Sequence, residues 1–130
     1  MSNLSISDHQ IFNLISVIIP NWNGAHHLPV CLDSLQRQTY PHVEVIVVDN
    51  GSRDESLDVL AHYPDVRTLA LGENRGFTGA CNAGFQAAQG DIQVLLNNDT
   101  EADPGWLQAI AAAFAAHPEV GLVASKMLLF

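Results

Sequence analysis

A chain of 130 residues with 48% hydrophobic residues has the length of one domain and enough apolar side chains for a core, which excludes a disordered protein. Its formal net charge of -9, with only 5 Lys and Arg residues, argues against nucleic acid or an anionic membrane surface as a partner. The same charge implies that a phosphorylated ligand would need a cation beside it, and a metal ion is the simplest source.

The two cysteines and the lack of long apolar segments indicate the cell compartment. Cys31 and Cys81 have no short spacing and fall on expected apolar helix faces, so we interpret them as buried free thiols. The chain opens with no signal sequence, and no apolar run is long enough to cross a bilayer. We therefore expect a cytoplasmic location, while membrane association of a full-length protein stays open.

The first half of the chain predicts two buried strands joined by a helix. Residues 15–19 are an apolar, β-branched run that is closed by Pro20. Apolar residues at helical spacing over 28–35 predict a helix, with Pro29 in its first turn, where a missing N–H costs little. A second apolar run over 43–48 predicts the second strand.

After the second strand the alternation of strands and helices continues. Ser52 and Glu55 form a capping-box pattern, which favours a short helix here over a hairpin turn. Residues 66–71 predict a third strand nearer the sheet edge, and 77–88 predict a helix that Gly90 would close.

The last part of the chain predicts one more repeat of this unit. A fourth strand is expected over 92–96, followed by a helix with Asp103 as N-cap and Pro104 at its first position. A fifth strand is expected to begin over 120–124. Together these elements predict a three-layer α/β/α fold with a mostly parallel, Rossmann-like sheet. The apolar residues 127–130 lack a polar cap, which favours a fold that continues beyond the given sequence and has an edge open to self-association.

Two acidic loops follow buried strands and define the candidate site. Asp49 follows the second strand, and Asn97, Asn98 and Asp99 follow the fourth. Because ligands of open α/β sheets lie at the carboxyl ends of the strands, these loops predict one site for a polar ligand and a divalent cation. The alternative for both aspartates is a structural role, in which they accept hydrogen bonds from backbone N–H groups of their turns.

Three further residues have both a binding and a structural interpretation. Trp22 follows the first strand and either stacks on a nucleobase or covers the sheet edge. Gly76 opens a helix whose N-terminal amides can face an anion. Arg75 beside it is either a phosphate contact or a solvated loop cation.

Several other chemistries are excluded by the motifs. The chain has no glycine pattern of a dinucleotide site, no phosphate-binding loop and no nucleophile elbow. His26, His27 and the other histidines lack metal-ligand spacing and are interpreted as surface residues.

Five segments in order and spacing resemble the N-terminal, nucleotide-sugar-binding part of family 2 glycosyltransferases, which have the GT-A fold. The segments are residues 16–24, 32–41, 47–54, 73–84 and 95–100, and the agreement extends over roughly 16–124. The chain differs at Asn97, where the family often has an aspartate, a variant that resembles rhamnosyltransferase-like members.

The resemblance implies roles for residues of the candidate site. Trp22 would stack on the base, Asp49 would accept the base N–H, and Asn98 would meet the ribose. Asp99 would bind a Mn or Mg ion that bridges the diphosphate. The full nucleotide-binding set that we predict is Pro20, Trp22, Asn23, Asp49, Gly51, Arg75, Gly76, Asn82 and Asn98, with Asp99 as the metal ligand.

The resemblance also implies an activity and a domain division. We expect an inverting, metal-assisted glycosyltransferase of the hexosyltransferase type that moves a sugar from a UDP- or dTDP-sugar to a saccharide or lipid-linked acceptor, in cell-surface polysaccharide synthesis. Residues 1–14 would be a loose arm and 15–130 the donor-binding part of a domain that continues. The general base is expected beyond residue 130, so the chain alone would be inactive. A sugar-nucleotide pyrophosphorylase and a non-catalytic nucleotide-sugar-binding module are the alternatives.

Overall fold

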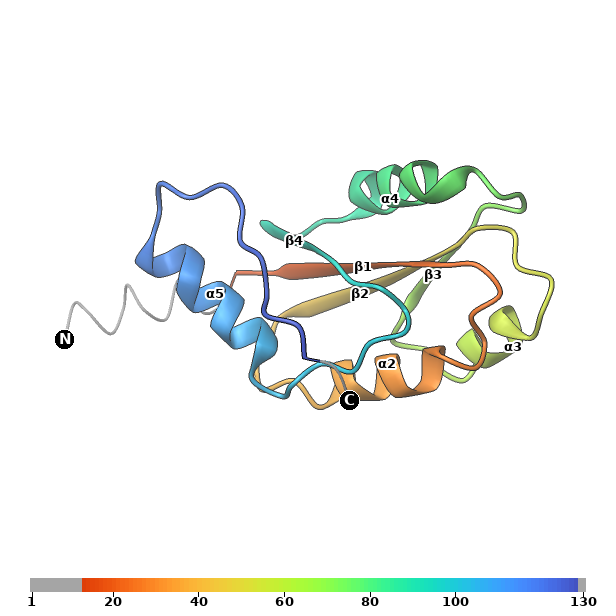
Figure 1. Cartoon of the computed structure of the whole chain (residues 1–130), viewed down its shortest axis with the longest axis horizontal. Coiled ribbons are helices and arrows are strands. Elements are labelled where there is room, and N and C mark those ends of the chain that lie inside the picture. Colours follow the sequence, from red (N-terminus) through yellow and green to blue (C-terminus); the bar gives the residue numbers. More distant parts are fainter. Residues whose placement is uncertain (1–12, 129–130) are drawn as a thin grey trace.

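The computed structural model of the chain describes residues 13–128 and has a four-stranded parallel sheet between two layers of helices (Figure 1). The strands are β1 (Ile15–Asn21), β2 (Val43–Asp49), β3 (Arg67–Ala70) and β4 (Ile92–Leu95), in the order β3-β2-β1-β4. The helices are α2 (Leu28–Gln36), α3 (Ser56–Leu60), α4 (Gly76–Ala87) and α5 (Trp106–Ala116). Helix α4 covers one face of the sheet, and α2, α3 and α5 lie on the other. The predicted three-layer α/β/α fold is confirmed.

Strand β1 is the centre of the sheet. Ile15 pairs in register with Val43 of β2 on one side and with Ile92 of β4 on the other. All of its residues from Ile15 to Ile19 are fully buried, because helices cover both faces. Since the three polar loops after β1, β2 and β4 leave the same edge of the sheet, this pairing brings them together.

Helix α4 packs closely on its face because it contains a glycine at the contact. A Cβ atom on Gly84 would overlap Ile18 Cγ2 and would lie 3.1 Å from Val48 Cγ2. Ile18, Ile46, Val48 and Ala80 form the core of this layer.

The opposite layer holds the larger core. Leu28, Cys31 and Leu32 of α2 pack with residues of β1 and with Leu107 of α5, as the helical spacing predicted. Both Cys31 and Cys81 are buried and free, which confirms the interpretation of the thiols.

The amino ends of the strands are tied together by a polar cluster far from the three loops. Ser16 Oγ donates to Glu44 Oε2 at 2.6 Å and accepts from Gly90 N at 2.8 Å. Gly90 therefore lies against β1 and does not close α4, which ends at Ala87. The prediction that Gly90 is a helix-terminal glycine is wrong.

Two predicted helix starts are also wrong. Helix α3 begins at Ser56, whose N–H donates to Asp54 Oδ1 at 2.9 Å, and Ser52 is bonded elsewhere. Helix α5 begins at Trp106, and Asp103 Oδ1 instead accepts from Gly105 N in the preceding turn. The side chains of Ser52 and Asp103 each stabilise the loop that precedes the helix instead of capping the helix.

The predicted fifth strand is absent from residues 13–128. Residues 120–124 are irregular, and the segment is bonded back to α5: Val120 N donates to His117 O, and Trp106 Nε1 donates to Ser125 Oγ. No helix of the described residues is long and apolar enough to span a bilayer. Residues 1–12 of the predicted arm and 129–130 of the apolar end lie outside the described residues.

Candidate functional site

A cleft of about 390 Å³ lies at the carboxyl ends of β1, β2 and β4. Its lining residues are Pro20, Asn21, Trp22, Asn50, Asn74, Phe77, Asn97, Asn98 and Asp99. Five of these are asparagines, one is an aspartate and none is cationic. The lining can therefore both donate and accept hydrogen bonds, but it carries no positive charge of its own.

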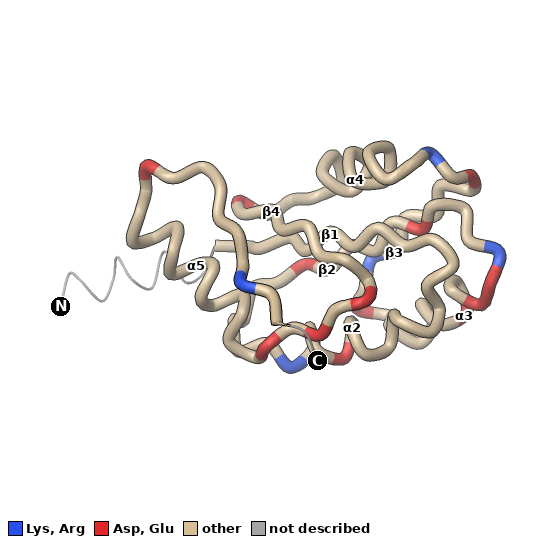
Figure 2. The backbone as a smooth tube through the Cα atoms, viewed as in Figure 1, with Lys and Arg blue, Asp and Glu red and all other residues tan. Residues whose placement is uncertain are grey.

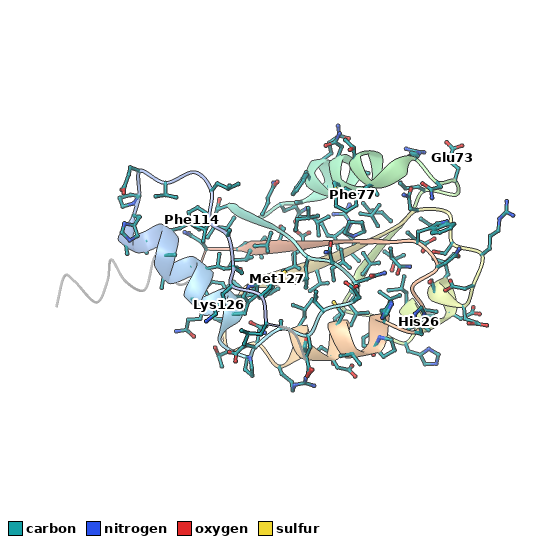
Figure 3. The ribbon with its side chains drawn as sticks, viewed as in Figure 1. His26, Glu73, Phe77, Phe114, Lys126 and Met127 are labelled. Atoms are coloured by element: carbon teal, nitrogen blue, oxygen red, sulfur yellow. The ribbon has the colours of Figure 1, made fainter. Side chains whose placement is uncertain are left out.

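Two aromatic side chains are exposed at this cleft. Trp22, which follows β1, is 56% exposed, and Phe77 is 59% exposed. Figure 3 labels Phe77 in the first turn of α4. Exposed aromatic faces of this size can stack on a flat ring. From the sequence, Phe77 is only the first residue of the helix expected over 77–88, and its place at the cleft was not predicted. Its position in the first turn after a polar loop was the available signal.

Asp49 lies beneath the cleft and is 1% exposed. Its Oδ1 accepts from Ser52 Oγ at 2.7 Å and from Asn21 Nδ2 at 3.1 Å, and its Oδ2 accepts from Ser52 N at 3.1 Å. These bonds tie the end of β1 to the loop after β2. Asn23, with a φ of 51°, completes the contact, because its Oδ1 accepts from Arg53 N at 2.8 Å.

Asn21 connects this buried carboxylate to the loop after β4. Its Oδ1 accepts from Asn98 Nδ2 at 2.8 Å, and its own Nδ2 points to Asp49. A Cβ atom on Gly24 would overlap both Asn98 Nδ2 and Asn21 Oδ1, so the glycine makes room for this contact. Asn21 did not figure in the sequence-based set, because a single asparagine at a strand end is typical of any loop entry.

Asn50 holds the loop before α4. Its Oδ1 accepts from Arg75 N at 2.8 Å, and its Nδ2 donates to Asn74 Oδ1 and Gly76 O at 3.1 Å. Gly51 has a φ of 79°, and a Cβ there would lie 2.7 Å from the Glu73 backbone. The two loops are thus in close backbone contact at the cleft.

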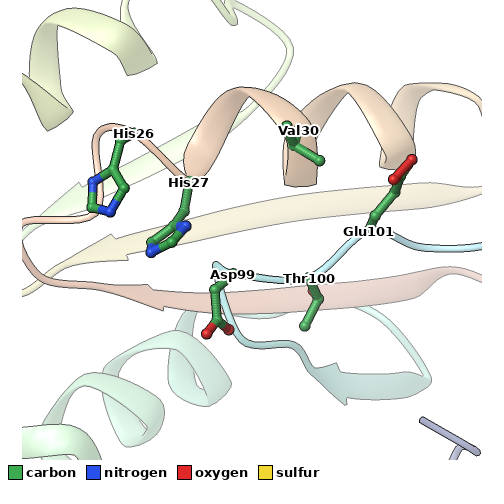
Figure 4. Close-up of a pocket in the computed structure, with 6 residues that line it drawn as sticks. All are labelled: His26, His27, Val30, Asp99, Thr100 and Glu101. Atoms are coloured by element: carbon green, nitrogen blue, oxygen red, sulfur yellow. The ribbon is translucent and has the colours of Figure 1, made fainter. Parts of the chain in front are cut away.

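Asp99 lies on the wall between the cleft and a second cavity of about 280 Å³ (Figure 4). The second cavity is lined by His26, His27, Val30, Asp99, Thr100 and Glu101. Both histidines are exposed, as predicted. Acidic positions recur between β4 and α5, whereas basic positions are scattered singly (Figure 2). The Asp99 carboxylate and the amide oxygens of Asn97 and Asn98 are a donor set that suits a hard divalent cation.

Asp99 is the one acidic side chain among the described residues that line the cleft. No group of three or more His, Cys, Asp or Glu side chains within residues 13–128 is placed to bind a metal. A Mg or Mn ion often keeps several waters and takes its other ligands from substrate phosphates, which fits a wall with one carboxylate.

The loop that carries Asp99 is anchored from below by α2. Cys31 Sγ donates to Asn97 O at 3.8 Å, and Ser34 Oγ accepts from Ala102 N at 2.9 Å. Burial raises the pKa of the Cys31 thiol to about 11, so the thiol is a neutral donor at neutral pH. Asp99 therefore projects from a loop that is bonded on both sides of it.

The structure thus divides the predicted nucleotide-binding set. Pro20, Trp22, Asn98 and Asp99 line the cleft. Asn23, Asp49 and Gly51 build the loops beneath it, and Gly76 is bonded through its carbonyl to Asn50. Arg75 is half-exposed and lies 3.6 Å from Glu73 Oε1. Asn82 is exposed on α4 and lines neither cavity. Their roles toward a ligand stay predictions.

Comparison with known proteins places the chain in a family. The model of "Glycosyl transferase family 2" matches residues 16–127. An uncharacterized glycosyltransferase of Nostoc sp., alr2836, is 38% identical over 113 residues, covering 84% of this chain and 35% of the relative. Glycosyltransferase AglE of Haloferax volcanii is 35% identical over 100 residues, covering 72% of this chain and 33% of the relative. The chain therefore spans about a third of the length of these relatives.

Solved structures agree with the sequence comparison. Residues 1–349 of S. aureus TarS, in complex with UDP, have a TM-score of 0.76 and 27% identity, and the match covers 81% of this chain and 33% of that 1–349 chain. The mannosyltransferase PcManGT of Pyrobaculum calidifontis, in complex with GDP-Man and Mn2+, has a TM-score of 0.71 and 29% identity, covering 84% of this chain and 34% of PcManGT. The predicted likeness to GT-A glycosyltransferases is confirmed. Since the family model matches most of the chain and both comparisons agree with it, the chain belongs to glycosyl transferase family 2.

Proposed function

We propose that the chain is the donor-binding part of a glycosyltransferase that moves a sugar from a nucleoside diphosphate sugar to an acceptor hydroxyl. The observation that carries the proposal is the amide-lined cleft between Trp22, Phe77 and Asp99. Related structures support it: TarS is described in complex with UDP and with UDP-GlcNAc, and PcManGT with GDP-Man. We propose UDP or dTDP as the nucleotide, and a saccharide or lipid-linked acceptor in cell-surface polysaccharide synthesis.

The base would lie at the aromatic side of the cleft. Trp22 offers an exposed face for stacking, and Phe77 offers a second apolar surface. The carboxylate of Asp49 has about four lone-pair sites, of which its three internal hydrogen bonds use three. One acceptor position on Oδ2 is therefore left for a base N–H.

The diphosphate would lie toward Asp99. No cationic residue lines the cleft. Arg75, the basic residue that the sequence suggested as a phosphate contact, has its Nε 3.6 Å from Glu73 Oε1. A diphosphate beside Asp99 would be repelled unless a divalent cation lay between them. We propose that Asp99 would hold this cation, with Asn98 at the ribose, and such an ion would supply positive charge beside the leaving diphosphate.

We propose that transfer inverts the anomeric carbon in one displacement. A carboxylate base takes the proton of the acceptor hydroxyl, the acceptor oxygen forms the new bond, and the bond to the diphosphate breaks with its electron pair on the leaving oxygen. Asp99 is the one carboxylate among the described residues lining the cleft. Because it is assigned to the cation, the base must come from elsewhere.

Titration calorimetry with UDP, dTDP and GDP, in Mn and in EDTA, tests the proposal. We expect Mn to strengthen UDP or dTDP binding by at least about tenfold, since it neutralises the repulsion at Asp99. Asp99→Ala should abolish this Mn dependence. Asp103→Asn is the matched control, because it removes a charge from the same loop and keeps an acceptor for Gly105 N. Equal affinity in Mn and EDTA would exclude the metal role of Asp99.

The two alternatives are distinguished by the lining of the cleft and by an activity assay rather than by UDP affinity. A sugar-nucleotide pyrophosphorylase usually has a basic, glycine-rich loop after the first strand, and the cleft here has no basic residue. A non-catalytic binding module would bind UDP with the same affinity but would not support transfer in any longer protein that contains the chain.

A further inference from the structure

We propose that Asn21 is a positioning residue of the donor site. Its side chain donates a hydrogen bond to the buried Asp49 and accepts one from Asn98. These two bonds form a relay that fixes which side-chain atoms Asn98 presents to the cleft. The inference rests on the proposed function for the identity of the ligand, but the geometry of the relay is independent of it.

The relay begins at a group that accepts hydrogen bonds. Asp49 is 1% exposed, and its two side-chain oxygens accept the hydrogen bonds from Asn21 and Ser52. Asn21, also 1% exposed, must therefore turn its amide NH2 toward Asp49 Oδ1, at 3.1 Å. The shape of the Asn21 amide alone would leave its orientation open, and this contact with Asp49 sets it.

In the second step, the fixed orientation of the Asn21 amide fixes the orientation of the Asn98 amide. With its NH2 committed to Asp49, Asn21 presents its Oδ1 to the loop after β4, where Asn98 Nδ2 donates to it at 2.8 Å. The Asn21 backbone is fixed as well, because its carbonyl accepts from Asn50 N at 2.8 Å. Gly24 closes the site so tightly that a Cβ would overlap both amides.

The consequence is a defined polarity at the cleft wall. Asn98 must direct its NH2 to Asn21, so its carbonyl oxygen is not used in this contact and is available to the cleft that Asn98 lines. A carbonyl oxygen accepts from a hydroxyl or N–H group of a ligand, such as a sugar hydroxyl of a nucleoside diphosphate.

A double-mutant cycle separates this role from a merely structural one. UDP affinity in Mn is measured for Asn21→Leu, Asn98→Ala and the double variant. If Asn21 acts through Asn98, each single change weakens UDP binding by about 5- to 10-fold, and the double variant is weaker than the worse single variant by no more than about twofold. Losses that multiply, or an Asn21→Leu variant with unchanged affinity, would overturn the proposal.

Gly24→Ala tests the same contact from another side, in case a buried leucine at residue 21 prevents folding. Its added Cβ would separate the two amides while leaving Asn21 in place, so we expect a similar loss of UDP affinity that is again not additive with Asn98→Ala. Ser16→Ala is the matched control. Ser16 is fully buried and polar on the same strand, but its contacts lie at the opposite end. It should lower stability and leave UDP affinity within about twofold.

A measurement without ligand tests the relay through Asn21 separately from the proposed function in nucleotide-sugar binding. The side-chain NH2 signals of Asn98 in a nitrogen-15 correlation spectrum should shift in Asn21→Leu and in Asp49→Asn, but not in Ser16→Ala. If the unmodified chain binds none of UDP, dTDP and GDP, the proposed function fails, while these shifts still decide the relay. If UDP binds and the Asn98 signals do not respond to changes at Asn21 or Asp49, the relay is wrong and the proposed function stands.

Discussion

Trp22 and Trp106 differ in a way that makes nucleotide binding directly observable. Trp22 is 56% exposed at the cleft, whereas Trp106 lies on α5 and donates through Nε1 to Ser125 Oγ. Only Trp22 is placed to stack on a base. A fluorescence change on ligand binding should therefore come from Trp22 alone.

We expect UDP to quench or shift the fluorescence, and Trp106→Phe to keep this change. Trp22→Ala should weaken UDP binding by about tenfold, since stacking on an aromatic residue contributes roughly 1–3 kcal/mol per base. Trp22→Phe keeps a stacking face and should lose less. Unchanged affinity in Trp22→Ala would show that the base lies elsewhere.

The raised pKa of the Cys31 thiol predicts how the free energy of unfolding changes at alkaline pH. Burial raises the pKa of its thiol from 9.0 to about 11, so the folded state favours the protonated form. The resulting stabilisation is complete below pH 9 and is lost as the pH rises through about 11, by roughly 2–3 kcal/mol in total.

Urea unfolding between pH 8 and pH 11 checks this expectation. The difference in unfolding free energy between the unmodified chain and Cys31→Val should shrink as the pH rises, because valine has no thiol to ionise. The tyrosines titrate in both proteins and cancel in the difference. A difference that is constant with pH would contradict the burial of an ionisable thiol.

Among the elements, α4 is the most sensitive to added volume. Gly84→Ala would drive a Cβ into Ile18 and toward Val48. We expect a loss of about 1–3 kcal/mol in unfolding free energy by urea titration, because the sheet core cannot give way without rearrangement. Gly121→Ala is the control, since nothing lies within 4 Å of its Cβ. Equal stability of the two variants would mean that α4 can shift away from the sheet.

The sequence predicts the strands of this fold better than the helix starts. Continuous apolar runs such as Ile15–Ile19 have one stable solution, burial on both faces, and the structure has it. Ser52 and Asp103 carry cap-like side chains, but each has a nearer use: Ser52 donates to Asp49, and Asp103 stabilises a turn. Local patterns cannot reveal such competing partners. The apolar residues 120–124 fit a strand by composition, yet a strand also needs a neighbour to pair with.

In the candidate site, too, some residues could be predicted from the local sequence and others could not. Trp22, Asn98 and Asp99 were predictable from their loops and lie at the cleft. Asn21 was not, because its importance comes from two partners, Asp49 and Asn98, that only the parallel pairing of β1 with both neighbours brings within reach.

For the molecule as a whole, we expect donor binding without transfer. The one carboxylate among the described residues lining the cleft is Asp99, and the acceptor position that Asp49 has left is assigned to the nucleobase. An acceptor hydroxyl at this cleft would therefore find no carboxylate among the described lining residues that is not already assigned to the cation. A radiolabelled-sugar assay should detect no product with the 130-residue chain, under conditions where calorimetry shows nucleotide binding. Transfer by this chain alone would contradict the expectation.

The central place of β1 has a consequence for synthesis on the ribosome. Ile15 pairs with Val43 and with Ile92, so one edge of β1 can be covered early and the other only after β4 has emerged. No local hairpin can protect that edge in the meantime, since all the pairings of β1 are parallel and need crossover helices. Between the emergence of β1 and that of β4, the nascent chain thus exposes one edge of a strand rich in valine and isoleucine, and in that interval a chaperone that binds extended apolar segments would find it.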